Sequence, residues 1–385
     1  MLTFRPPDRT LLPPAAIIAY RESRHARRSI VRSSRRYLYL GLFVLLAVGA
    51  WTGFWFYLAG KVRDGIDAWV AQQEAQGIQV AYTDLSISGY PYRIEVVAQD
   101  ITVAGPNLPG KGALAVPRLT VLSLPWNPRL VVAGIEGEVL FRWTDPKGAE
   151  QRATYKAAST GISVGFADGK PDRFAFSGDR PVVTATTLAA PVTAKVFEIH
   201  ARRLDGGAAP AAGGAAPTAP LLGELAIDGE AIRLPPDARN PLGPEIDRLA
   251  LTVGLAGPLP PVAPGQNLRT IVDAWARGGG TVELTRGEVK WGSLNLTLTG
   301  SFAVDREMRP MGAISGRIGG LEPLIDAAVA EGRLNDGQAR SIKQALGAIG
   351  FIARDQEGRV PVSATLQDGR IMVGPVPVGE LQPIF

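Results

Sequence analysis

Residues 289–305 read VKWGSLNLTLTGSFAVD, a stretch in which apolar and polar side chains alternate along most of its length. Because successive side chains of a strand point to opposite faces, one face of this stretch carries Leu294, Leu296, Leu298, Phe302 and Val304. The other face carries Asn295, Thr297, Thr299, Ser301 and Ala303. A period of two residues predicts strands of a sheet with one apolar face and one polar face.

The same period recurs through most of the chain. Strands are predicted within residues 78–103, 113–124, 130–143, 153–166, 181–187, 194–202 and 360–373. Turn-forming residues separate them, as at Asp145-Pro146-Lys147-Gly148 and Asp168-Gly169. Because strands follow one another without helices between them, we expect a mainly β (α+β) fold of elongated, curved antiparallel sheets.

A few short helices are expected to pack on these sheets. Residues 61–76 carry apolar side chains on one helical face, and Gly77 can end that helix in the left-handed conformation. Three more helices are predicted in the C-terminal part. They are a helix capped by Asn267, a helix over residues 321–329, and a helix that begins at Asn335, where Gln338 completes a capping box.

Residues 38–60 read LYLGLFVLLAVGAWTGFWFYLAG and contain no charged side chain. As a helix this segment would span about 35 Å, which is enough to cross a bilayer core of about 30 Å. We therefore predict a transmembrane signal-anchor helix over residues 37–60, preceded by a disordered basic tail over residues 1–36. The alternative is a cleaved signal peptide, although the apolar run exceeds the usual hydrophobic region of such peptides.

Basic charge is concentrated in the residues that precede this segment. Residues 1–60 hold nine arginines and no lysine against two acidic residues, a net charge of +7, whereas the rest of the chain carries −2. The positive-inside rule then places the N-terminus in the cytoplasm and residues 61–385 across the membrane. The nearly balanced remainder lacks the basic surface typical of nucleic-acid-binding domains, so no nucleic-acid partner is expected.

A low-complexity segment interrupts the predicted strands. Residues 206–220 contain only Gly, Ala, Pro and Thr, so they supply no large side chain for a core. We predict a linker or loop over residues 205–220. It would separate a first β region, residues 61–204 with the juxtamembrane helix, from a second, residues 221–385 with three short helices.

The sequence contains no convincing catalytic or metal site. There is no cysteine and there are two histidines, which excludes disulfides, cysteine metal sites and multi-histidine sites. Residues 161–165, GISVG, match a nucleophile elbow, but a turn follows instead of a helix, and His200 lies in a predicted strand. Residues 105–112, GPNLPGKG, lack the Ser or Thr and the following helix of a phosphate-binding loop.

Two pairs of carboxylates remain as candidates for acid–base chemistry. Asp228 with Glu230, and Glu283 with Glu288, lie in strand and turn contexts in which a solvated face is the ordinary role. We therefore predict a protein that is not an enzyme, with no catalytic residues, no cofactor and no metal.

Short motifs follow one another along the chain: Ser88-Gly89-Tyr90-Pro91-Tyr92, Gly278-Gly279-Gly280, Trp291-Gly292, Asp305 with Arg309-Pro310-Met311-Gly312, and Asp368-Gly369-Arg370 through Gly374-Pro375. In this order they resemble the bacterial family known as domain of unknown function 2125. The resemblance covers roughly residues 38–385. It implies a bacterial inner-membrane protein with one anchor and a long β-rich region in the periplasm, and it carries no assigned activity.

The motif Gly89-Tyr90-Pro91-Tyr92 has no assigned role. Proline biases the residue before it towards an extended conformation, and a glycine allows a bulge. We expect a kinked strand with both tyrosines on one side, either packed in the structure or in contact with a ligand.

Two functions fit a membrane-tethered β structure with one apolar face. In the first, residues Leu294, Leu296, Leu298, Phe302 and Val304 line an open groove that holds the acyl chains of a phospholipid or other envelope lipid. In the second, the protein is a scaffold or assembly factor of the cell envelope, and the apolar face is a closed core. Coverage of this face by the helices 321–329 and 342–349 would favour the scaffold, whereas an open trough would favour lipid.

Overall fold

The computed structural model describes residues 23–106, 108–204, 221–236, 240–258, 260, 267–373 and 376–384. The chain divides into two compact units, one ending at Val62 and one beginning at Arg63. The predicted segment 205–220 and the first part of the predicted tail, residues 1–22, lie outside the described residues.

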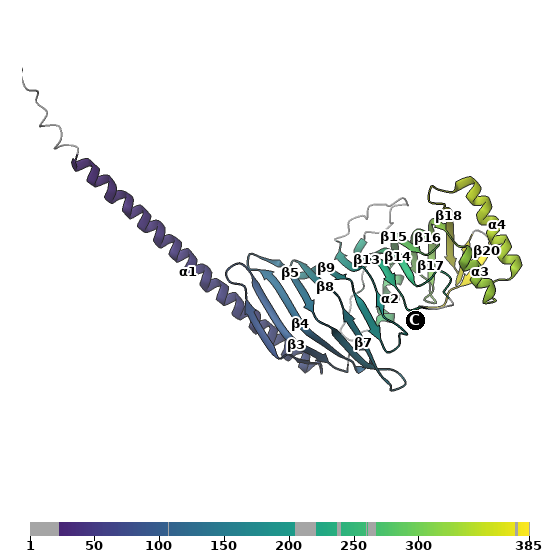
Figure 1. Ribbon diagram of the computed structural model, residues 1–385, viewed down its shortest axis with the longest axis horizontal. Helices are drawn as coiled ribbons and strands as arrows, with labels where there is room; N and C mark the ends of the chain where they lie inside the picture. Colours follow the sequence, from purple (N-terminus) through teal and green to yellow (C-terminus); the bar gives the residue numbers. More distant parts are fainter. Residues whose placement is uncertain are drawn as a thin grey trace, which may run out of the picture. The chain divides into compact units, whose positions relative to one another are not determined.

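One long helix, α1 (Ser23–Ala75), contains the predicted span (Figure 1). Within it, Arg35–Ala75 is long and apolar enough to cross a membrane, a test that an N-terminal signal sequence also passes. Residues 23–36 are helical, although a disordered tail was predicted there. Arginine is a good helix former, so this segment can extend the apolar helix. Gly77, with φ of 78°, ends the helix in the predicted left-handed conformation.

Twenty strands of the second unit join into one antiparallel sheet. The first ten are β1 (Gln79–Ala81), β2 (Asp84–Ser88), β3 (Ile94–Ala104), β4 (Ala113–Leu124), β5 (Asn127–Glu136), β6 (Val139–Thr144), β7 (Glu150–Lys156), β8 (Ser159–Ala167), β9 (Lys170–Asp179) and β10 (Val182–Ala185). The others are β11 (Val192–Thr193), β12 (Val196–Arg203), β13 (Leu221–Arg233), β14 (Glu245–Ala256), β15 (Thr281–Trp291), β16 (Leu294–Val304), β17 (Pro310–Gly319), β18 (Val360–Gln367), β19 (Arg370–Val373) and β20 (Val376–Glu380).

The main path through the sheet runs β2-β3-β4-β5-β8-β9-β12-β13-β14-β15-β16-β17-β18-β19-β20, as the pairings between neighbouring strands show. The mainly β, antiparallel prediction is thus confirmed. Strand β12 pairs directly with β13. The segment 205–220 therefore connects two neighbouring strands of one sheet, and the two predicted β regions share that sheet.

A second ladder branches from this path and returns to it. The strands β6, β7, β10 and β11 pair in sequence, β6 pairs with the start of β4, and β11 pairs with the end of β13. Together with β5, β8, β9 and β12 they close a ring of paired strands between β4 and β13. Over this part the strands therefore form two layers, whereas β14 to β18 form one layer.

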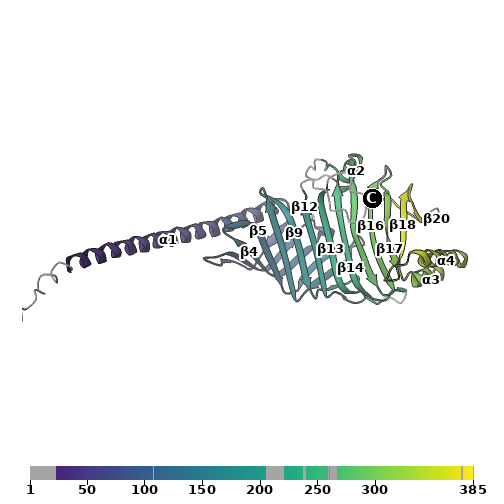
Figure 2. The same ribbon diagram turned by 90° about the horizontal axis from the view of Figure 1, so that it is seen from above.

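Four helical segments besides α1 connect the strands. They are the short 3-10 helix η1 (Pro109–Lys111), α2 (Leu268–Arg277), α3 (Glu322–Ala330) and α4 (Asp336–Ala353). The predicted caps are confirmed: Asn267 accepts a hydrogen bond from the Arg269 N–H, and Asn335 and Gln338 form a capping box. Helix α4 packs against β18 and α3 packs against α4. Both lie at the β18 end of the sheet in the two views (Figures 1 and 2).

Candidate ligand-binding face

Directly opposed residues of an antiparallel sheet share a face, so the strand registers show which side chains lie together. One row of opposed residues crosses twelve strands without a polar side chain. In order from β3 to β18 it consists of Val96, Val121, Ala133, Ile162, Phe176, Ile199, Ile227, Leu251, Gly287, Leu298, Gly316 and Val362. This row defines what we call the apolar face.

The rows on either side of it have the same character. The first contains Ile94, Ser123, Val131, Val164, Phe174, Ala201, Leu225, Val253, Leu284, Gly300, Ile314 and Ala364. The second contains Ala98, Leu119, Ile135, Thr160, Gly178, Phe197, Gly229, Leu249, Val289, Leu296, Ile318 and Val360. Three adjacent rows therefore cross twelve strands without a charged side chain.

The five residues predicted to face lipid all lie on this face. Leu296 and Leu298 belong to the rows above, and Leu294, Phe302 and Val304 follow the same alternation in β16. All five are half-buried. The structure thus bears out their common face, whereas their contact with lipid stays a prediction.

Coverage of the apolar face differs along the sheet. In the ring between β4 and β13, the Tyr155 hydroxyl of β7 lies 3.0 Å from the Thr160 hydroxyl of β8, so the second ladder packs over the third row there. Beyond β13 the sheet is single, and α3 and α4 lie at the β18 end instead of along β16 (Figure 2). The apolar face is thus enclosed at one part and open at another.

A concavity of about 730 Å³ lies where the enclosed part opens, in the volume range typical of small-molecule sites. Its floor consists of apolar residues from five neighbouring strands: Val164, Phe174, Ala201, Leu225, Val253 and Leu255. Phe174, Leu225 and Leu255 are 39%, 41% and 43% exposed, which is unusual for large apolar side chains on one floor. Its rim is charged, and there Arg202 pairs with Glu224 at 3.0 Å and Arg173 with Asp172 at 3.2 Å.

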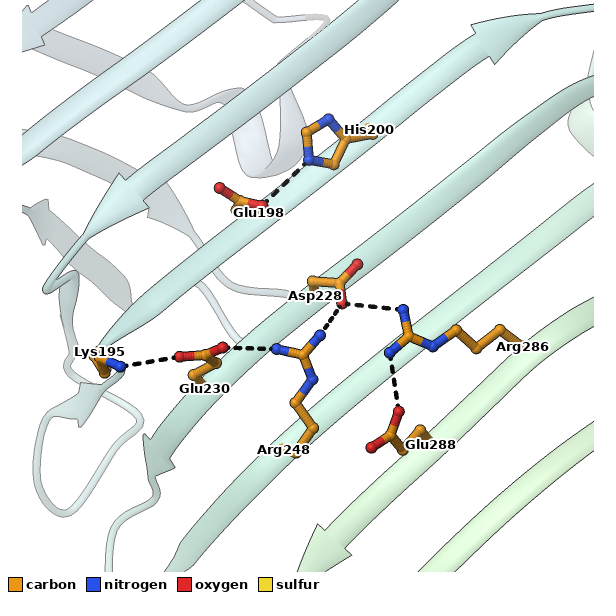
Figure 3. Close-up of polar contacts among 8 residues, drawn as sticks. All are labelled: Lys195, Glu198, His200, Asp228, Glu230, Arg248, Arg286 and Glu288. Atoms are coloured by element: carbon orange, nitrogen blue, oxygen red, sulfur yellow. Dashed lines mark hydrogen bonds and ion pairs between the residues drawn. The ribbon is translucent and has the colours of Figure 1, made fainter.

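The opposite face of the same strands carries a chain of ion pairs (Figure 3). Arg248 of β14 donates to Asp228 at 2.7 Å and to Glu230 at 2.8 Å. Lys195 also pairs with Glu230, and Arg286 pairs with Glu288. The pKa of the Glu288 carboxyl lies below its usual range, chiefly because it accepts a hydrogen bond from Arg286. Over the three rows the sheet is therefore amphipathic, with its charged side chains on the face opposite the apolar face.

The candidate catalytic groups do not form a catalytic arrangement. Ser163 and His200 lie on the polar face in one row, but Ala175 of β9 stands between them. Two strand spacings are about 10 Å, beyond hydrogen-bond reach. His200 instead contacts Glu198 at 3.4 Å. The phosphate-loop candidate contains η1 and leads into strand β4, not into an α-helix.

The four carboxylates of the two candidate pairs accept hydrogen bonds from other side chains. Asp228 and Glu230 both accept from Arg248, and Glu288 accepts from Arg286. Glu283 accepts from the hydroxyls of Thr281 and Ser301. Across the described ranges, no group of three or more His, Asp or Glu side chains is arranged to hold a metal ion.

The tyrosine motif forms a turn and not the predicted kinked strand. Gly89, with φ of 102°, and Tyr90, Pro91 and Tyr92 join β2 to β3, and the Tyr92 and Arg93 N–H groups both donate to the Gly89 carbonyl. A Cβ at position 89 would lie 2.7 Å from the Arg93 carbonyl oxygen, so the turn needs glycine there. The chain therefore reverses direction at this motif, with a positive φ at Gly89 and a cis peptide bond between Tyr90 and Pro91.

The sequence could have revealed the apolar residues of β8, β9, β12, β13 and β14, because apolar side chains recur at alternate positions in each of these strands. What it could not reveal is the register that aligns all five, since β12 is separated from both β9 and β13 by longer stretches of chain. The concavity depends on this alignment, as its floor draws one or two residues from each strand.

The family model described as "Uncharacterized protein conserved in bacteria (DUF2125)" matches residues 55–382. The chain therefore belongs to this bacterial family, in agreement with the resemblance of its motifs. Searches of the curated proteins and of the solved structures found no significant match.

Proposed function

We propose that this member of the family is a single-pass protein of the bacterial inner membrane that shelters the acyl chains of an envelope lipid on its apolar face. The observation that carries this proposal is the alignment of three uncharged rows across twelve strands. An extended hydrocarbon chain needs a long apolar surface and few polar partners, which is what these rows provide.

The membrane anchor in this proposal is residues 37–60. Their length and lack of charge support a span, and the arginines before them support a cytoplasmic N-terminus with residues 61–385 in the periplasm. The anchor would keep the apolar face close to the bilayer that supplies its ligand.

The open part of the apolar face favours lipid over the scaffold alternative. A scaffold would need this face as a closed core, with helices along β16. Helices α3 and α4 lie at the β18 end instead, and three large side chains of the concavity floor stay about two-fifths exposed. We propose no catalytic step, because none of the candidate carboxylates or Ser163 has a suitably placed partner.

Site-specific photocrosslinking in intact cells tests the proposal. The full-length chain would carry a photoreactive benzoylphenylalanine at Leu225 or Leu298, on the apolar face, in cells fed radioactive phosphate. Matched controls at Ala226 and Thr297 place the same group at the neighbouring position of the same strands, on the polar face. We expect phospholipid adducts at Leu225 and Leu298 and few at the controls. Equal adducts at all four sites, or none, would contradict a lipid-binding face.

A further inference from the structure

Two neighbouring turns at one end of the strands expose large aromatic and aliphatic side chains. Tyr90 and Tyr92 of the β2–β3 turn are 45% and 72% exposed, and Trp126 of the β4–β5 turn is 58% exposed. Leu124 and Leu130, which flank the second turn, are also exposed. The turns are adjacent because Ile94, at the start of β3, pairs with Ser123, near the end of β4. We call these five side chains the aromatic rim.

Two other turns of the sheet are charged instead of apolar. The β16–β17 turn, at the same end of the strands, consists of Asp305 to Arg309 and is held by ion pairs of Arg309. The β6–β7 turn, at the opposite end, consists of Asp145 to Ala149, and the Asp145 side chain accepts the N–H groups of Lys147 and Ala149. Exposed large apolar side chains also occur elsewhere, as at Leu268 and Phe351, but they gather at the two rim turns and not at these two charged turns.

Its composition matches the interface between lipid headgroups and acyl chains. Tyrosine and tryptophan gather at that depth because they combine an apolar ring with a polar tip, and leucines at turn tips can reach the hydrocarbon boundary. Arg93, which pairs with Glu95 at 2.7 Å, and Arg129, in the strand after Trp126, add positive charge beside the rim. Basic side chains at this depth meet the headgroups of anionic lipids.

The first residue of the second unit contacts the hairpin that carries the first rim turn. Only Lys61 and Val62 separate the apolar segment from Arg63, the first residue of the unit. The Arg63 guanidinium donates to the Leu85 carbonyl of β2 at 3.4 Å, and β2 leads into the turn with Tyr90 and Tyr92. Two residues of the chain therefore separate the apolar segment from a residue that contacts the β2–β3 hairpin.

We propose that the aromatic rim docks into the surface of the bilayer that holds the anchor. The docked orientation has a consequence for the concavity. Phe174 and Leu225 lie in the same row as Ile94, the row nearest the rim end of the strands. The concavity therefore lies towards the end of the strands that docks on the bilayer. The inference rests on the proposed membrane anchor, but not on the proposed lipid-binding face.

Single cysteines test this docking directly, because the chain contains none of its own. Full-length Tyr92→Cys and Leu124→Cys chains would be labelled with the environment-sensitive dye NBD and reconstituted into vesicles of phosphatidylethanolamine and phosphatidylglycerol. Lys147→Cys, at the opposite end of the strands, and Glu307→Cys, at the same end but in a charged turn, are the matched controls. The readouts are the NBD emission maximum and quenching by lipids that carry a nitroxide on the acyl chain.

We expect blue-shifted emission and strong quenching at positions 92 and 124, with little quenching at 147 and 307. Equal and weak quenching at all four positions, in chains that float with the vesicles, would overturn the docking and leave the anchor intact. Chains that do not float would contradict the anchor and the docking together. Strong quenching at 147 as well would show a different orientation and would also overturn the proposal.

Discussion

Truncation of the concavity floor is the sharpest test of lipid binding that the structure offers. Full burial of a Leu or Phe side chain is worth about 1.5–3 kcal/mol. Because Phe174, Leu225 and Leu255 are already about three-fifths buried, a ligand can gain only the exposed remainder of each. Summed over the three side chains, the exposed remainder can contribute about 2–4 kcal/mol to the free energy of lipid binding. When all three residues become alanine, the affinity for lipid should therefore fall at least about 30-fold.

The assay is a binding titration of the purified full-length chain with a phospholipid that carries a fluorescent acyl chain. Met311 supplies the matched control, because it is 42% exposed, like Leu225, but lies on the polar face of β17. Met311→Ala removes a comparable apolar area and should leave the Kd within about threefold, less than a 1 kcal/mol change. Two results would refute the reasoning. One is a triple variant that binds as well as the parent chain, and the other is a Met311→Ala variant that loses as much.

The polar face and the aspartate turns give two further predictions. Arg248→Met should lower the free energy of unfolding by about 1–2 kcal/mol, because it leaves Asp228 and Glu230 without their shared partner, and the loss should shrink in high salt. Urea unfolding measures this loss, with Arg202→Met as the comparison. That substitution removes the exposed Arg202–Glu224 pair and should lower the free energy of unfolding by less than about 1 kcal/mol. The pKa of Asp355 is lowered by hydrogen bonds from Arg359, and hydrogen bonds also outweigh burial at Asp305 to lower its pKa. Stability from these two groups is present above about pH 4 and should fall as the pH drops through their folded pKa values, so acid unfolding of the double Asn variant should depend less on pH there.

Local patterns predicted many elements of this fold, because a few neighbouring residues are enough to indicate a strand or a helix cap. The strands β9, β13, β14 and β17 lie outside the predicted ranges. The alternation from Leu294 to Val304 is the strand β16, and Asn335 with Gln338 is the cap of α4. The Gly89 turn escaped prediction because the local sequence Gly89-Tyr90-Pro91-Tyr92 fits a kinked strand as well as a turn. Only the pairing of β2 with β3 on either side of it decides between the two.

The site itself could not be predicted from single segments. Its floor needs Phe174 next to Ala201 and Ala201 next to Leu225, across a connection of low-complexity sequence. Nothing local in residues 205–220 indicates that the strands on either side of them are neighbours. The ring closed by β6, β7, β10 and β11 could not be predicted for the same reason, since it depends on the pairing of β11 with the end of β13.

A single irregularity in β15 shows how the apolar face is kept continuous. Val282 and Leu284 have even numbers and Val289 and Trp291 have odd numbers, so a regular strand would place the two pairs on opposite faces. The register shifts by one residue between Leu284 and Gly287, opposite β16, and this bulge returns both pairs to the apolar face. Without it, Glu288 and Lys290 would lie beside Leu296, where charged groups are costly. The sequence therefore changes its alternation where the backbone changes its register. The apolar rows run on past that point to β18, as a binding surface for a long hydrocarbon chain requires.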